Sequence, residues 1–246
     1  MNVKRKVLGL IAMAATVMAV VLWPAQVAVA AGGIIESGAC EGTTACDNNT
    51  GIIKSGACHG FDSCDNNGRI IKEDACFGGQ SCDDNSAIIK QGACSGGQSC
   101  SMNDGVIGRE ACSGPQSCIG NTGKIGNKAC SAFMSCGNNA GKIWTEACGG
   151  TMSCTRNDGF IGKGSCMGKD SCEGNTGWIK SGSCNAEGSC KNNSGVIARN
   201  SCNDTVGDCE NNERGGKKHH KHDKHEHSKH KHKKGDHHKW WRKDAD

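Results

Sequence analysis

Residues 34–69 read IIESGACEGTTACDNNTG followed by IIKSGACHGFDSCDNNGR, so the second 18 residues repeat the pattern of the first. The same spacing continues to Asn212 and defines ten units, whose positions we number from 1 at Ile34. Of the 20 cysteines, 19 fall at position 7 or 13 of a unit, and Cys209 lies one residue late. A fixed period of this kind is typical of a protein in which one small unit stacks on its neighbours.

A few positions of the unit are nearly constant and the others vary freely. Position 2 is Ile in all ten units, position 6 is Ala or Ser, position 12 is Ser in eight units, and position 16 is Asn. Position 18 is usually Gly. The Gly and Asn content argues against a helix, because each Gly costs about 0.8–1 kcal/mol relative to Ala in a helix interior. It favours β-structure with tight corners, where these residues supply positive φ angles.

We therefore predict an all-β fold, a parallel β-solenoid of ten 18-residue coils, each divided into about three short sides. Positions 2, 7 and 13 are predicted to point inward. With a rise of about 4.8 Å per coil, the rod would be on the order of 50 Å long. The Asn side chains at position 16 are expected to hydrogen-bond from coil to coil as a ladder. One Ile per coil is too little core to offset the chain entropy, so the cystines must complete the core.

We predict one disulfide within each coil and no free cysteine. Bridged cysteines have Cα atoms about 5.5–6 Å apart, whereas six residues of extended strand span about 20 Å. A Cys40–Cys46 bridge therefore needs a corner, which we place at Gly42. Bridges between stacked coils are the alternative, although stacked Cβ atoms point in parallel and suit disulfide geometry poorly. Cys202–Cys209 would be an irregular terminal bridge.

The two ends of the chain differ from the repeat domain at residues 31–212. Residues 1–30 have the parts of a secretory signal peptide: a basic start at residues 4–6, an apolar run at 7–22 and the small residues of Ala28-Val29-Ala30. An uncleaved membrane anchor is the alternative, but a spanning helix needs about 20 apolar residues. Because disulfides persist outside the cytosol, we expect a secreted or cell-surface protein, extracellular or periplasmic.

Residues 213–246 form a basic tail with twelve Lys or Arg against six Asp or Glu, and we expect it to be disordered. Nine histidines in it are candidate ligands for Zn²⁺, Ni²⁺ or Cu²⁺: His219, His220, His222, His225, His227, His230, His232, His237 and His238. Metal affinity would be lost as the pH falls through about 6.5. The alternative role is electrostatic attachment to an anionic cell-surface polymer or lipid. No cofactor is required and no specific nucleic-acid partner is expected.

Other chemistries fit the repeats poorly. The C-x₅-C spacing lies outside that of zinc sites. A calcium-binding β-roll also has 18 residues per coil, but as two nine-residue halves, so that positions 7 and 16 would carry equivalent residues; this chain has Cys and Asn there. An active site needs unlike groups that converge, whereas these coils repeat the same groups. His59 is the one histidine of the repeats, and we expect it to be exposed and structural. We therefore expect no enzymatic activity.

The chain resembles the beetle antifreeze β-solenoids, which are also small, repetitive and disulfide-braced. Those proteins present an outward Thr-x-Thr on each coil. Here Thr43 and Thr44 are the one adjacent pair in the repeats, and no threonine column exists. The resemblance therefore implies the architecture and not ice binding.

The sequence as a whole indicates an exported, non-enzymatic structural or surface protein, a rigid rod with a tail for attachment or metal binding. Two alternatives remain open at this point. One is an extracellular protein that sequesters transition metals, with the rod as carrier. The other is a β-helix that binds polysaccharide.

Overall fold

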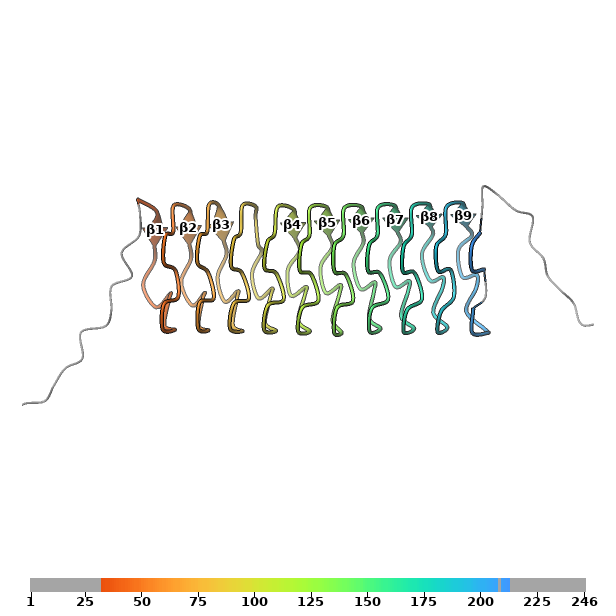
Figure 1. The fold of residues 1–246 in the computed structure, drawn as a ribbon, viewed down its shortest axis with the longest axis horizontal. Helices are drawn as coiled ribbons and strands as arrows, with labels where there is room; N and C mark the ends of the chain where they lie inside the picture. Colours follow the sequence, from red (N-terminus) through yellow and green to blue (C-terminus); the bar gives the residue numbers. More distant parts are fainter. Residues whose placement is uncertain (1–31, 208, 213–246) are drawn as a thin grey trace, which may run out of the picture. The chain divides into compact units, whose positions relative to one another are not determined.

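The computed structural model describes residues 32–207 and 209–212, which form a parallel β-solenoid of ten coils (Figure 1). Nine coils each contribute a two-residue strand: β1 (Ile34–Ile35), β2 (Ile52–Ile53), β3 (Ile70–Ile71), β4 (Val106–Ile107), β5 (Lys124–Ile125), β6 (Lys142–Ile143), β7 (Phe160–Ile161), β8 (Trp178–Ile179) and β9 (Val196–Ile197). Within these described residues there is no helix, and hence no helical segment able to cross a bilayer.

The coils stack in strict register, because each strand pairs in parallel with the strand 18 residues away, as in Ile34↔Ile52. Strands β1–β3 form one sheet and β4–β9 another. Between the two sheets, Ile89 makes isolated parallel bridges to Ile71 and Ile107, so the column continues through the fourth coil. The predicted parallel β-solenoid is confirmed.

Only one side of each coil contains a β-strand. The remaining sides are turns, and four positions of the coil recur in the left-handed region: 5, 7, 11 and 15. The first cysteine of every bridge has φ between 60° and 64°. These left-handed residues bend the chain at intervals too short for strands to form.

The corner between the first two cysteines also differs from the prediction. Its left-handed residue is Thr44, with φ of 55°, and not Gly42. Gly42 instead allows close stacking, because a Cβ there would lie 2.0 Å from the carbonyl oxygen of Gly60 in the next coil. Glycine is needed at this position for space and not for its backbone angle.

The interior consists of columns that run along the stack. The Ile at position 2 and both cysteines are essentially inaccessible to solvent in the central coils, as predicted, and so are the small residue at position 6, the Ser at position 12 and the Asn at position 16. A repeated set of small and medium side chains therefore fills each coil.

Disulfides and amide bonds cross-link this interior. Ten disulfides close the ten coils, from Cys40–Cys46 to the wider-spaced Cys202–Cys209, and the described residues include no free cysteine. The Asn ladder is also present: Asn67 Nδ2 donates to Asn49 Oδ1 at 2.8 Å, and the same bond recurs coil by coil to Asn212. Each coil is thus closed on itself by sulfur and joined to the next by amide groups.

Candidate functional surface: a basic face with aromatic residues

The predicted metal ligands at His219 to His238 lie outside the residues that the structure describes. The segments predicted to be a signal peptide (1–30) and a tail (213–246) lie outside them as well. A candidate site can therefore be described only among the residues of the rod.

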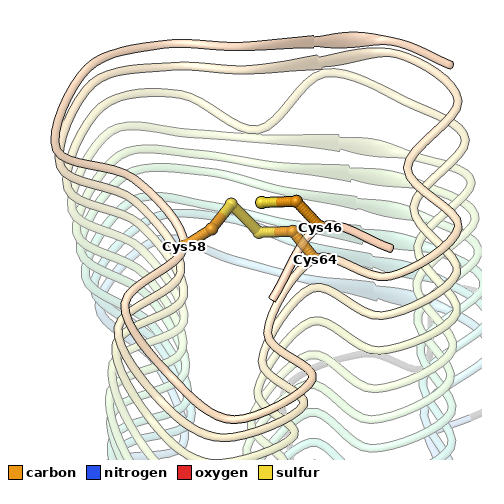
Figure 2. A group of neighbouring side chains, drawn as sticks. All are labelled: Cys46, Cys58 and Cys64. Atoms are coloured by element: carbon orange, nitrogen blue, oxygen red, sulfur yellow. A yellow bond between two sulfur atoms is a disulfide. The ribbon is translucent and has the colours of Figure 1, made fainter. Parts of the chain in front are cut away.

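Closely spaced sulfur atoms occur within the rod, but their chemistry is accounted for by disulfides. The Sγ atoms of Cys46, Cys58 and Cys64 lie within 4.8 Å of one another. Figure 2 shows why: the Cys58–Cys64 bridge lies directly beside the sulfur of Cys46, which belongs to the bridge of the preceding coil. Disulfide sulfur carries no thiolate to offer a metal ion. These groups are packed cystines.

His59 is half-buried and not exposed as expected. Its ring stacks on that of Phe77, with centroids 4.9 Å apart and planes 10° from parallel. Its Nδ1 lies 3.2 Å from a carboxylate oxygen of Glu41. These contacts join three successive coils at position 8, which agrees with the structural role predicted for His59.

Charge is strongly segregated around the rod. Positions 1–4, which comprise the strand and the turn after it, carry nine basic residues and two acidic ones in the described coils. We call this side the basic face; its basic residues are Lys54, Lys72, Lys90, Arg109, Lys124, Lys142, Lys163, Lys180 and Arg199. The other positions carry five basic residues against sixteen acidic ones. The rod is therefore basic along one side and acidic over the remainder.

The strands aim the basic residues outward. Position 2 is the buried Ile, and side chains alternate across a strand, so positions 1 and 3 both face solvent. Lys124 and Lys142 are register partners at position 1 of β5 and β6, and both are exposed. Lys90 and Trp144 occupy position 3 of nearby coils.

Between these side chains lies a shallow groove of about 200 Å³, lined by Lys90, Val106, Lys124, Lys142 and Trp144. Gly108 and Gly126 occupy position 3 in the two coils between Lys90 and Trp144, and both also line the groove. Because glycine projects no side chain, this stretch of the face stays open. The groove runs along the stack from the fourth coil to the seventh.

Aromatic residues continue the face beyond the groove. Trp144, Phe160 and Trp178 form a row in which successive ring centroids are 6.1 and 5.0 Å apart, each pair tilted by 55°. The Trp144 side chain is 46% exposed and that of Trp178 is 52% exposed. Lys142 Nζ lies 5.0 Å from the Trp144 ring centroid and 6.0 Å from that of Phe160. Cation–π contacts of this kind hold the lysine over the rings without neutralising its charge.

The acidic side has its own titration behaviour. Burial, together with the like charges of Asp62, Asp47 and Asp83, raises the pKa of Asp65 to about 6, against a hydrogen bond from the Asp47 backbone N–H. Burial likewise raises the pKa of Asp83, which lies at the same position of the next coil. Carboxylates stacked at the 18-residue spacing thus repel one another.

The basic face was missed in the reading of the sequence, although a signal for it was present. A tally of charges by repeat position, instead of over the whole repeat domain, separates the two sides. The aromatic row has a weaker signal, because Trp144 is at position 3 and Phe160 and Trp178 are at position 1. Their proximity depends on the stacking geometry.

Fold and surface together define the class: a disulfide-braced parallel β-solenoid with regular coils. The chain belongs to the family described as a domain of unknown function, DUF7640, which it matches over residues 25–114 and 110–218. No curated protein and no solved structure matches the chain. The two matched segments together span the repeats.

Proposed function

We propose that this protein is an exported, non-enzymatic structural protein whose rod acts as a rigid spacer or display surface at the cell exterior. One observation carries the proposal: every coil is closed by its own disulfide, and the same interior columns fill the whole stack. In such a repeat array, stability is approximately the sum of coil and interface contributions. Such a rod should be long-lived and of fixed length, as a spacer requires.

The oxidising compartment follows from the cystines. Ten disulfides in one small domain indicate folding outside a reducing cytosol. Secretion to the cell surface or periplasm is the more specific proposal, supported by the signal-peptide pattern at residues 1–30.

The absence of enzymatic activity is proposed from the character of the interior. In the described coils its buried polar groups are chiefly Asn at position 16 and Ser at position 12 in repeated columns, and the few others, such as Thr155 and Ser165, are isolated hydroxyls. Catalysis depends on unlike groups in a defined geometry. A uniform column of amides and hydroxyls supports stacking and not a reaction.

The tail is proposed to attach the rod to an anionic surface, and its histidines offer metal capture as the second role. Zn²⁺, Ni²⁺ or Cu²⁺ would be held by neutral imidazoles, so binding should weaken on protonation. Full-length protein and a truncation ending at Asn212 should be compared for cell association and, by calorimetry, for binding of each metal at pH 7.4 and 5.5. Loss of association at any metal level supports attachment. Loss confined to a metal-dependent effect supports capture and contradicts attachment.

The spacer role has a separate test, deletion of residues 70–105, which removes two whole coils and keeps the register. Solution scattering should show a rod shorter by about 10 Å, at about 4.8 Å per coil. Because the tail is proposed to anchor the C-terminal end, access of a large antibody to an epitope at the N-terminal end of the rod, measured on the cell, should fall with the shortened rod. An unchanged reach would contradict the spacer role.

A further inference from the structure

The basic face carries positive charge that the rod itself does not neutralise. Among the described residues, the carboxylates within 4.0 Å of a basic group on this face are those of Glu36, paired with Lys54, and Glu146, paired with Lys163. The other seven basic residues have no such partner: Lys72, Lys90, Arg109, Lys124, Lys142, Lys180 and Arg199. On the acidic side, by contrast, Arg156 and Lys191 both pair with Glu173. The unpaired positive charge is concentrated on one side.

The arrangement also has a cost for the fold. Lys124 and Lys142 are direct register partners on adjacent strands, and like charges directly opposite one another destabilise a sheet. Acidic residues are plentiful elsewhere on the rod, yet neither lysine faces one. Such a pair is consistent with an anionic ligand that supplies the missing counter-charge.

Exposed aromatic rings extend the same face in line with the lysines. The column at position 1 runs Lys124, Lys142, Phe160, Trp178, each in register with the next. Since the coils repeat at a constant rise, this column presents charges and then rings at regular intervals along a straight line. A flexible globular partner would not need that regularity, whereas a linear polymer would.

We propose that the basic face binds an extended acidic polysaccharide, with Lys90, Lys124 and Lys142 contacting its carboxylates or sulfates. Trp144 and Trp178 stack against the apolar faces of its sugar rings. The oxidising compartment favours this ligand over nucleic acid, because linear polyanions outside the cytosol are chiefly acidic glycans. The acidic remainder of the rod repels the same polymer, so binding is confined to one side. This proposal is separate from the spacer role, which needs no ligand on the rod.

The basic tail also attracts polyanions, so the test compares charge-matched variants of the full chain. Lys124→Gln/Lys142→Gln removes two charges from the basic face, and Lys128→Gln/Lys169→Gln removes two from elsewhere. The probe is polygalacturonate, with its methyl ester as the neutral form of the same backbone. We expect the first variant to weaken binding about tenfold, which corresponds to 1.4 kcal/mol. The second variant should weaken binding less than about twofold. Binding by the wild type should be salt-dependent and nearly absent for the ester.

Trp178→Ala separates ring stacking from charge alone. It should weaken polygalacturonate binding without changing the salt dependence, since no charge is removed. Equal losses in the two double variants would overturn the proposal and leave the tail as the polyanion site. Equal binding of acid and ester would overturn it as well, because binding would then not depend on the polymer's charge. Thiol titration and circular dichroism of each variant confirm that the rod is intact.

Two further probes and a sedimentation measurement test the class of ligand. Oligothymidylate and phosphatidylserine vesicles carry negative charge but lack the sugar rings of polygalacturonate. Sedimentation measures self-association of the protein. If Trp178→Ala lowers the affinity for either probe more than the affinity for polygalacturonate, the assignment to a polysaccharide is overturned. Self-association that Lys124→Gln/Lys142→Gln abolishes would also overturn it, because the face would then bind the acidic side of a second copy.

Discussion

Asn139 donates a hydrogen bond from its side-chain Nδ2 to Oδ1 of Asn121, 2.8 Å away in the preceding coil, and both side chains are fully buried. Asn139 Nδ2 also donates to the carbonyl oxygen of Gly141. The amide therefore joins two coils and fixes the corner that leads into the next strand. An apolar residue of similar size would fill the space but could make neither bond.

The first prediction concerns this ladder. In Asn121→Ala, Asn139 Nδ2 loses its acceptor in the preceding coil and Asn103 Oδ1 loses its donor in the following coil. Buried amide groups then lose hydrogen bonds that water cannot replace. Unsatisfied buried polar groups cost about 1–3 kcal/mol each, so the free energy of unfolding should fall by about 2–4 kcal/mol. Guanidinium unfolding measures the loss. Thr122→Ala, at the exposed adjacent residue, is the control and should change little; equal effects would contradict the ladder's role.

Gly141 gives a second prediction, based on space between coils. A Cβ at this residue would lie 2.1 Å from the carbonyl oxygen of Gly159 and 2.7 Å from Asn157 Nδ2. Gly141→Ala should therefore separate the coils and destabilise the rod by about 1–3 kcal/mol, as measured by guanidinium unfolding. At Gly137 the nearest atom would be 3.6 Å away, so Gly137→Ala should be tolerated. Comparable losses in the two variants would show that the stack can adjust.

The fold was predicted closely because the same constant residues recur in every 18-residue unit. The period, the cysteine spacing and the constant Ile and Asn led to the solenoid, the pairing within each coil and the amide ladder. The left-handed corners were harder to predict from the sequence, because residues such as Met134 and Glu110 adopt positive φ although neither favours it. Hydrogen bonds between coils hold them there: the N–H of Met134 donates to the carbonyl oxygen of Pro115 and that of Glu110 to Gln91.

The basic face was not predicted, for a related reason. Variable positions appear random along the chain, and only the stacking of coils places Lys142 beside Phe160 of the next coil. The histidine tail remains a prediction, because it lies outside the described residues. What repeats in the sequence therefore determines the architecture, and what varies determines the surface.

The third prediction concerns the Ser column at position 12. Seven of these hydroxyls are buried without a hydrogen-bond partner, among them that of Ser117, whereas Ser189 Oγ donates to the carbonyl oxygen of Ala186 at 2.7 Å. Ser117→Ala should leave stability unchanged or raise it by up to about 1 kcal/mol, because no bond is lost. Ser189→Ala should cost about 0.5–1.5 kcal/mol. The first coil already carries Ala45 at this position.

Thermal unfolding of both serine variants checks the contrast. A clear loss of stability in Ser117→Ala would contradict the prediction and indicate that the hydroxyl binds a buried water.

Reduction of the disulfides should begin at the ends of the rod. Cys202 is 8% exposed, and Cys40 and Cys209 are partly exposed, whereas the central cystines are inaccessible. A reductant must reach the sulfur directly, and terminal coils have a neighbour on one side only. Limited reduction followed by alkylation and peptide mass spectrometry should therefore label Cys40–Cys46 and Cys202–Cys209 first. Early labelling of Cys112–Cys118 would contradict this order.

Asp65 predicts how stability depends on pH. Burial raises its folded-state pKa to about 6, above the value of about 3.9 for an unfolded chain. Between these values the folded state binds more protons than the unfolded state, so the stabilisation from this group is complete below about pH 4 and is lost as the pH rises through about 6. Asp65→Asn removes the titration and keeps an acceptor oxygen for the Asp47 N–H. The variant should therefore be more stable than the wild type at pH 7 and similar to it at pH 3.5, as measured by guanidinium unfolding at both pH values. A stabilisation of equal size at both pH values would show that the gain comes from packing and not from the charge.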